Sequence, residues 1–193
     1  MPRSLRLLLP VAALLAGAAL AGCGSDAATG DKGYVGGEGA IAVLPVSERR
    51  APGPVSGTTL QGKDVSLDDY AGKPVVVNVW GSWCAPCRAE SGKLTAAAKS
   101  LGADVAFLGI NVRDPGGTDK SLAFERRFKV GYPSLYDPAG RTLLAFHGNV
   151  TLASIPSTVV VDSKGRVAAS IIGPVPSART LEDLVADVEK GTA

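Results

Sequence analysis

The sequence is poor in histidine and cysteine and carries almost no net charge. Among 193 residues there are one histidine, His147, and three cysteines, Cys23, Cys84 and Cys87. Basic and acidic side chains nearly balance, at 20 Lys and Arg against 18 Asp and Glu. Because a nucleic-acid-binding surface needs an excess of positive charge, nucleic acid is not an expected partner. The length suits one compact domain with an additional segment.

The N-terminal apolar run is too short to cross a membrane. Residues 7–19 are rich in Leu and Ala but include Pro10, and a spanning helix needs about 20 apolar residues. Arg3 and Arg6 precede the run, and small residues follow it. Basic residues, a short apolar run and a small-residue cleavage site are the parts of a secretory signal. We therefore predict a signal peptide over residues 1–22, in preference to a permanent membrane anchor.

The end of this segment, Leu20-Ala21-Gly22-Cys23, resembles the bacterial lipobox. The resemblance implies that Cys23 is lipidated and anchors the protein on the extracytoplasmic face of a bacterial cell membrane. Residues 24–39 are rich in Gly, Ala, Ser and Asp, a composition that buries little apolar surface. We predict a flexible tether over residues 23–50 and a folded domain over residues 51–193.

Predicted strands and helices alternate along the folded domain. The run Val75-Val76-Val77-Asn78-Val79-Trp80 is typical of a strand buried on both faces, and it should be the central strand. The patterns around it predict helices over 85–101, 120–128 and 178–190, a strand over 105–111, and hairpins over 55–67 and 158–172. This order indicates an α/β fold with a mixed sheet flanked by helices.

Cys84 and Cys87 lie where the central strand meets the following helix. A helix N-terminus favours the thiolate, which is the attacking species. We predict that Cys84 is the exposed nucleophile and that Cys87, one turn inward, resolves the mixed disulfide. A structural disulfide closing so short a loop would gain little stability. Zinc would need two further ligands, for which only His147 remains, so no metal is expected, and no cofactor beyond the redox-active Cys pair.

The stretch Trp80-Gly81-Ser82-Trp83-Cys84-Ala85-Pro86-Cys87-Arg88-Ala89-Glu90 resembles the active site of the thioredoxin superfamily. More narrowly it resembles the TlpA/ResA-like group of extracytoplasmic thiol–disulfide oxidoreductases, as do Asp-Asp-Tyr-Ala-Gly-Lys-Pro at 68–74 and Ile-Pro-Ser-Thr at 155–158. The likeness covers about residues 51–190. It implies a thioredoxin-like fold, in which a central mixed β-sheet is flanked by helices and extended by an N-terminal β-hairpin.

The resemblance also implies roles for residues around the Cys pair. Ile155 and Pro156 would form a cis-proline loop against the pair, with the backbone of Ile155 offered to a substrate peptide. Glu90 would help to tune thiol protonation, although a solvated carboxylate that favours the helix dipole is an alternative. Trp83 could restrict access to Cys84 and offer substrates a docking surface, or it could serve packing alone.

One position departs from cytoplasmic thioredoxins, which carry a buried Asp on the strand six residues before the first Cys. Here that residue is Asn78. An amide cannot accept the proton of the resolving thiol, so this role would pass to another group such as Glu90, or to water. The departure argues against a general thioredoxin and is compatible with the exported group.

The expected activity is electron exchange with exported protein thiols, and a membrane thiol–disulfide relay protein would be the electron donor or acceptor. A reductase of the cytochrome c biogenesis type is the first hypothesis, and an oxidant that forms disulfides in exported proteins is the second. A thiol peroxidase would be expected to carry its reactive Cys in a Pro-x-x-x-Thr-x-x-Cys loop, and here Trp83-Cys84 stands in that place instead. A copper chaperone using His147 would usually separate its two cysteines by three residues.

Overall fold

The computed structural model describes residues 40–152 and 154–191. Within these residues six strands form one sheet in the order β1-β8-β7-β4-β5-β6. Neighbours β4, β5 and β6 run parallel, whereas β7 pairs antiparallel with β4, β8 with β7, and β1 with β8. The strands are β1 (Ala40–Val43), β4 (Val75–Trp80), β5 (Ala106–Val112), β6 (Ser134–Asp137), β7 (Ser157–Val161) and β8 (Val167–Ile172). The predicted mixed sheet with a central β4 is confirmed.

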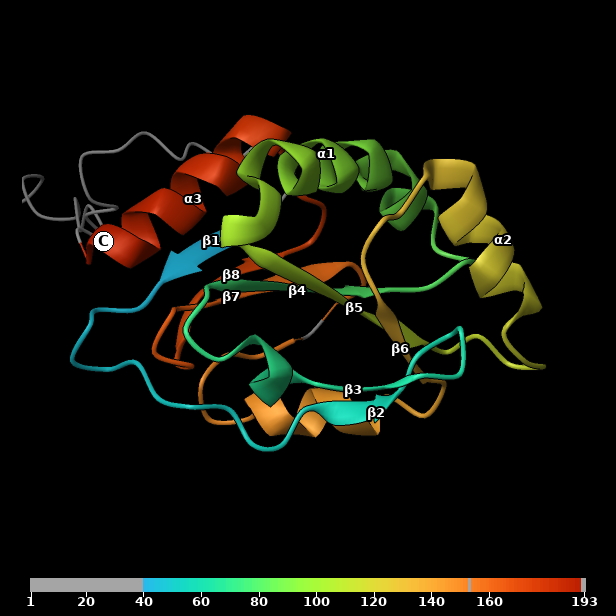
Figure 1. The fold of residues 1–193 in the computed structure, drawn as a ribbon, viewed down its shortest axis with the longest axis horizontal. Helices are drawn as coiled ribbons and strands as arrows, with labels where there is room; N and C mark the ends of the chain where they lie inside the picture. Colours follow the sequence, from blue (N-terminus) through green and yellow to red (C-terminus); the bar gives the residue numbers. More distant parts are fainter. Residues whose placement is uncertain (1–39, 153, 192–193) are drawn as a thin grey trace, which may run out of the picture. The chain divides into compact units, whose positions relative to one another are not determined.

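Helices cover one face of this sheet and a small hairpin covers the other (Figure 1). α1 (Ala85–Leu101) and α3 (Ala178–Lys190) lie across the first face, with α2 (Asp119–Phe128) toward the β6 end. On the second face lie β2 (Ser56–Thr58), β3 (Asp64–Ser66) and the 3-10 helix η3 (Arg141–Phe146). Two further 3-10 helices are η1 (Leu67–Tyr70) and η2 (Gly102–Asp104). The predicted hairpin extension and the three predicted helices are therefore confirmed.

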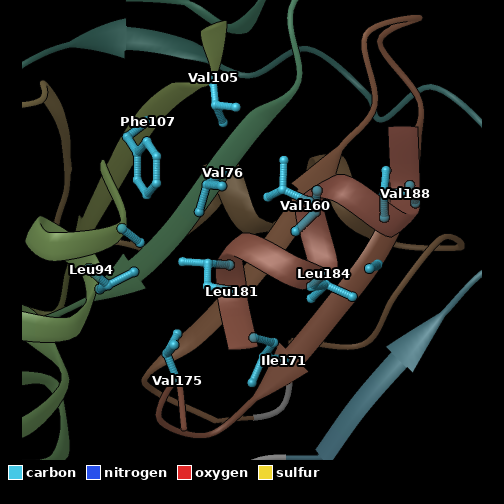
Figure 2. Close-up of a cluster of buried hydrophobic side chains, with 14 residues drawn as sticks. Val76, Leu94, Val105, Phe107, Val160, Ile171, Val175, Leu181, Leu184 and Val188 are labelled. Carbon is cyan, nitrogen blue, oxygen red and sulfur yellow. The ribbon is translucent and has the colours of Figure 1, made fainter. Parts of the chain in front are cut away.

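Each face of the sheet has its own apolar core, so β4 is buried on both sides. Figure 2 shows the first core, in which Val76, Val160 and Ile171 project from the strands toward α3. The apolar residues of α3 recur at helical spacing and form one buried face: Leu181, Leu184, Val185 and Val188. On the opposite face Phe146 of η3 is fully buried against the strands. Burial on both sides holds the end of β4, and hence the Cys pair, in a fixed place.

The predicted tether extends too far along the chain. Ala40 to Val43 form strand β1, which pairs with β8 from Ala40 opposite Ile172 to Val43 opposite Ala169. The fold therefore includes residues 40–50, before the predicted start at residue 51. Sequence patterns missed β1 because four residues followed by Pro45 carry little strand signal, and because its partner lies far along the chain. Cys23 and the predicted signal peptide lie outside the described residues.

A buried arginine fastens this N-terminal segment to the C-terminal helix. The Arg49 guanidinium donates to Val188 O at 2.9 Å, and its Nη1 lies 3.5 Å from Asp162 Oδ2. Arg166 also donates to Asp162 Oδ2, at 2.7 Å. Burial acts to raise the pKa of Asp162, but the hydrogen bonds from Arg166 outweigh it and hold that pKa below its usual range. Asp162 is thus the carboxylate that joins the two arginines.

Replacing Asp162 by Asn should lower the free energy of unfolding at pH 7 by about 3 kcal/mol, because Arg49 loses a buried carboxylate partner. A lowered pKa stabilises the fold at pH values above the unfolded-chain pKa, and this contribution is lost as pH falls through the folded-state pKa. The free energies of unfolding in urea should therefore differ widely between the wild type and Asp162→Asn at pH 7. The difference should narrow as pH falls below the ordinary Asp pKa of about 3.9.

The control for this prediction is Asp183→Asn, which breaks the exposed ion pair between Asp183 and Arg179 on α3. An exposed pair contributes little, so its loss should change the free energy of unfolding by no more than about 0.5 kcal/mol. Equal losses in the two variants would contradict the role given to Asp162.

Candidate active site

The two central cysteines form a disulfide at the start of α1. Cys84 is the N-cap residue of the helix, and Cys87 lies in its first turn. Pro86 is tolerated in that turn because proline has no backbone N–H, and the first N–H groups of a helix have no partner within it. The backbone N–H of Cys87 points at Cys84 Sγ at 3.2 Å. After reduction the same N–H and the helix dipole would stabilise a thiolate on Cys84. The predicted pairing of Cys84 with Cys87 is confirmed.

The prediction that Cys84 is exposed is wrong for this oxidised state. Cys84 is 2% exposed and Cys87 is 1% exposed, so the two sulfurs are almost equally covered. They pack in an apolar cluster with Trp80 and Phe124. The pattern of the sequence indicates which cysteine comes first in the helix, but it does not show the distant side chains that cover both.

A cis-proline loop faces the disulfide. The Ile155–Pro156 bond is cis, as the resemblance implied, and Ile155 O lies 3.7 Å from Cys84 Sγ. The loop is tied to β8 by the N–H of Gly173, which donates to Pro156 O at 3.0 Å. Its β7 end is held by Ser157, whose hydroxyl donates to Ser154 O at 2.6 Å. The structure therefore brings Ile155 and Pro156 together with the Cys pair.

Trp83 lies beside the disulfide with 48% of its surface exposed. Its indole N–H donates to Val112 O at 3.4 Å, and the ring passes so close to Gly81 that a Cβ there would lie 2.5 Å from Nε1. Glycine is thus required at position 81 for this placement of the ring. Such exposure exceeds that of a packing residue, and it leaves a flat aromatic surface next to Cys84.

Glu90 is completely buried, which rules out the alternative of a solvated carboxylate. Its carboxylate accepts hydrogen bonds from Val175 N at 2.7 Å and from Asn78 Nδ2 at 3.1 Å. Burial raises the pKa of Glu90 to about 7, against the opposing effect of these two hydrogen bonds and of Lys93. A carboxyl that titrates near neutral pH therefore lies one helical turn after Cys87.

Asn78 explains the departure from the thioredoxin pattern. Its amide donates to Glu90 and also to Thr158 Oγ1 at 3.2 Å. An Asp at this position would place a second carboxylate against Glu90, whereas an amide supplies the donor that Glu90 needs. Asn78 and Cys87 also line one small cavity, of about 10 Å³, beneath the active site. Asn78 and Glu90 form one polar unit under the Cys pair.

Sequence reasoning missed Asp114, which holds the loop in front of the cysteines. Asp114 is buried and accepts hydrogen bonds from Ser82 N at 2.8 Å and from Asn111 Nδ2 at 2.6 Å. Burial acts to raise its pKa, but the bonds from Ser82, Asn111 and Ser121 lower it overall. From the other side Arg88 donates twice to Ser82 O, at 2.7 and 3.0 Å. Ser82 is thus held through both of its backbone polar groups.

A topological signal could have found this cluster. Asn111 and Asp114 come at the end of β5, which is parallel to β4, so both strands deliver their following residues to the same edge of the sheet. His147, by contrast, is exposed at the end of η3. Across the described ranges no three His, Cys, Asp or Glu residues gather where they could hold a metal ion.

Glu90→Gln should shift alkylation of reduced Cys84 to lower pH. Wild-type Glu90 gains its charge near pH 7, and a neighbouring negative charge disfavours a thiolate and so raises the thiol pKa. Without that charge the thiolate forms at lower pH. The measurement is the rate of reaction with iodoacetamide as a function of pH.

Glu125→Gln is the matched control, because burial also raises the pKa of Glu125, on α2, where it accepts a hydrogen bond from Gln61. This variant should leave the alkylation profile in place. If the profiles of the wild type and Glu90→Gln coincide, Glu90 does not tune the thiols.

Fold and site together define a class of protein. A disulfide at the N-terminus of the helix after a central strand, facing a cis-proline loop, is built for exchange with a third sulfur. The surrounding mixed sheet and helices supply the thioredoxin-like scaffold. The class is that of the thioredoxin-like thiol–disulfide oxidoreductases.

Comparison with known proteins gives the same answer. The model of the AhpC/TSA family matches residues 48–170, and the chain belongs to this family. It is 31% identical over 135 residues to the thiol-disulfide oxidoreductase ResA of Geobacillus kaustophilus, covering 68% of this chain and 71% of that one. It is 34% identical over 148 residues to the thiol:disulfide interchange protein DsbE homolog of Paracoccus denitrificans, with coverages of 75% and 76%.

A solved structure supports the fold over about three quarters of this chain. The DsbF homologue of Corynebacterium diphtheriae superposes with a TM-score of 0.71 at 35% sequence identity, covering 76% of this chain and 92% of that one. The predicted resemblance to the thioredoxin superfamily and to ResA-like oxidoreductases is confirmed.

Proposed function

We propose that this protein is a reductant of exported protein disulfides, of the type that serves cytochrome c maturation. The observation that carries the direction is Glu90, buried one turn from Cys87 with a pKa of about 7. A carboxylate there disfavours thiolates and so withholds from the reduced pair the stabilisation that a thiolate would give it. A reduced form that lacks this stabilisation has a low reduction potential, the reverse of the strong oxidants whose reduced form is stabilised.

The exchange moves two electrons through two steps. The Cys84 thiolate attacks one sulfur of the partner disulfide, forming a mixed disulfide and releasing the partner's other sulfur as a thiolate. The Cys87 thiol loses its proton, and its thiolate attacks Cys84 Sγ, which forms the Cys84–Cys87 bond and releases the second partner thiolate. Asn78 and Glu90 line the inner side of this reaction, where Glu90 is suited to accept the proton. No cofactor beyond the Cys pair is proposed.

An oxidised product must be reduced again before the next cycle. We assign this step to a membrane thiol–disulfide relay protein, as the resemblance to the TlpA/ResA-like group implies. The proposed location is the extracytoplasmic face of the cell membrane, with Cys23 as the lipid anchor. None of the helices in residues 40–152 and 154–191 is long and apolar enough to span a bilayer.

The reduction potential of the Cys84/Cys87 couple tests the direction. Equilibration of the purified protein with defined thiol buffers should give a value near that of thioredoxin, about −270 mV. Glu90→Gln should raise the potential, because the reduced pair is then less disfavoured. A wild-type value near −120 mV, roughly that of a strong oxidant, would instead assign the formation of disulfides in exported proteins.

The family match raises one competing activity, thiol peroxidase, which consumption of hydrogen peroxide by the reduced protein would reveal. The Trp83-Cys84 sequence speaks against it, because it stands where a peroxidase would carry a Pro-x-x-x-Thr-x-x-Cys loop.

Lipidation is tested through Cys23. Cells expressing the wild type should incorporate labelled fatty acid into the protein and retain it in the membrane fraction, whereas Cys23→Ser should do neither. Cys84→Ser is the control, because it removes a cysteine outside the lipobox and should keep the label. Equal labelling of wild type and Cys23→Ser would refute the anchor.

A further inference from the structure

Two hollows lie along α1 and form one groove, which begins between α1 and α2 at the active-site end. Its first part is a hollow of about 730 Å³, with Ala85 and Ala89 of α1 on one side and Ala123 and Phe124 of α2 on the other. A second hollow of about 600 Å³ continues it, and Phe128 lines both. The groove thus has an apolar floor made of small side chains and three aromatic rings, those of Phe124, Phe128 and Tyr132.

Every charged side chain that lines this groove is positive. The first hollow is lined by Arg88, Lys120 and Arg127, and the second by Lys99 and Lys129. No Asp or Glu lines either hollow, although the whole chain has 18 acidic residues against 20 basic ones. The positive charge is therefore a property of this place on the surface and not of the composition.

These cations are available to a ligand. All five are exposed, and within the described part of the chain none of them forms an ion pair. Arg127 lies over the ring of Phe128, at 5.8 Å from its centroid, while Arg88 uses two nitrogens on Ser82 O. Like charges gathered without counter-charges repel each other, and an anionic partner would relieve that repulsion.

The groove is continuous with the redox site. Ala85, which lines it, follows Cys84 directly, and Ser82 lines it just before the pair. Phe124, on the floor of the groove, packs in the same apolar cluster as Cys84 and Cys87. A chain segment seated in the first hollow would therefore extend to the disulfide.

We propose that this groove, lined by Arg88, Lys120 and Arg127 over an apolar floor, docks an acidic, partly apolar segment of the partner protein that exchanges disulfides with Cys84. This inference rests on the proposed function and specifies the chemistry of its partner. A peptide fits better than an anionic membrane surface, because the charges surround a concave floor that a flat bilayer cannot enter. The apolar floor adds contact area, and the cations select the sign of the flanking residues.

The test compares two peptides that share one internal disulfide and the same apolar residues. One carries Asp and Glu around the disulfide and the other carries Lys. The reduced full-length protein, in non-ionic detergent, should reduce the acidic peptide with a kcat/KM about tenfold higher at low salt, and the preference should shrink at high salt. Reduction of the small neutral 2-hydroxyethyl disulfide gives the reference rate for each variant.

A charge-reversed variant tests whether the groove causes the preference for the acidic peptide. In Arg127→Glu the acidic-peptide rate, taken as a ratio to the reference rate, should fall by about threefold or more. Arg126→Glu is the matched control, because Arg126 is exposed on the same helix but does not line the groove. It should keep the wild-type preference.

Each contrary result has a distinct meaning. Equal rates for the two peptides, with normal reduction of the reference disulfide, overturn the groove proposal alone. An equal effect of Arg126→Glu overturns it as well, since the preference would then follow net charge. Loss of binding to phosphatidylglycerol vesicles in the charge-reversed variant, with an unchanged peptide preference, assigns the groove to lipid and overturns the peptide. Failure to reduce any probe overturns the proposed function and this inference together.

Discussion

Burial of β4 on both faces is the constraint on which the rest of this structure depends. A strand covered by two cores has no access to water, so its one polar residue, Asn78, must find partners inside the protein. Those partners are Thr158 on the next strand and Glu90 on α1. Glu90 in turn accepts from Val175, just after β8. The polar unit beneath the cysteines is thus also a joint between strand, helix and loop.

The sequence alone predicts the elements that carry strong local signals. The β-branched run of β4, the capping position of Cys84 and the helical spacing of apolar residues on α3 can each be recognised within one window of the chain. The elements it misses, β1 and β6, are four residues long and exist through pairing with distant strands. The burial of Cys84 escaped for the same reason, because it depends on distant segments that only the fold brings together, whereas Asp114 could have been found from its place at the end of a strand parallel to β4.

Helix α1 lies between two electrostatic environments, an acidic one on its buried side and a basic one on its exposed side. On the inner side α1 presents Glu90, a carboxyl whose protonation burial shifts toward neutral pH. On the outer side the same helix presents Arg88, which holds Ser82 in front of the cysteines and faces the positive groove. The inner environment controls the chemistry of the sulfurs, and the outer one is suited to choosing what reaches them. Substitutions can therefore alter the two properties independently.

The edge strands have a consequence for how the protein behaves in a crowded compartment. Strand β8 has six residues and β5 has seven, and without β1 and β6 each would offer a long apolar row of unpaired backbone groups. Such rows act as templates for other chains and lead to aggregation. Covering β8 with a strand of only four residues leaves a short template at the β1 end, whereas β6 is itself covered by a bridge from Thr59 to Leu135 and by Leu60 N, which donates to Ser134 O at 2.9 Å. Losing β1 would therefore endanger solubility before it endangered the redox site.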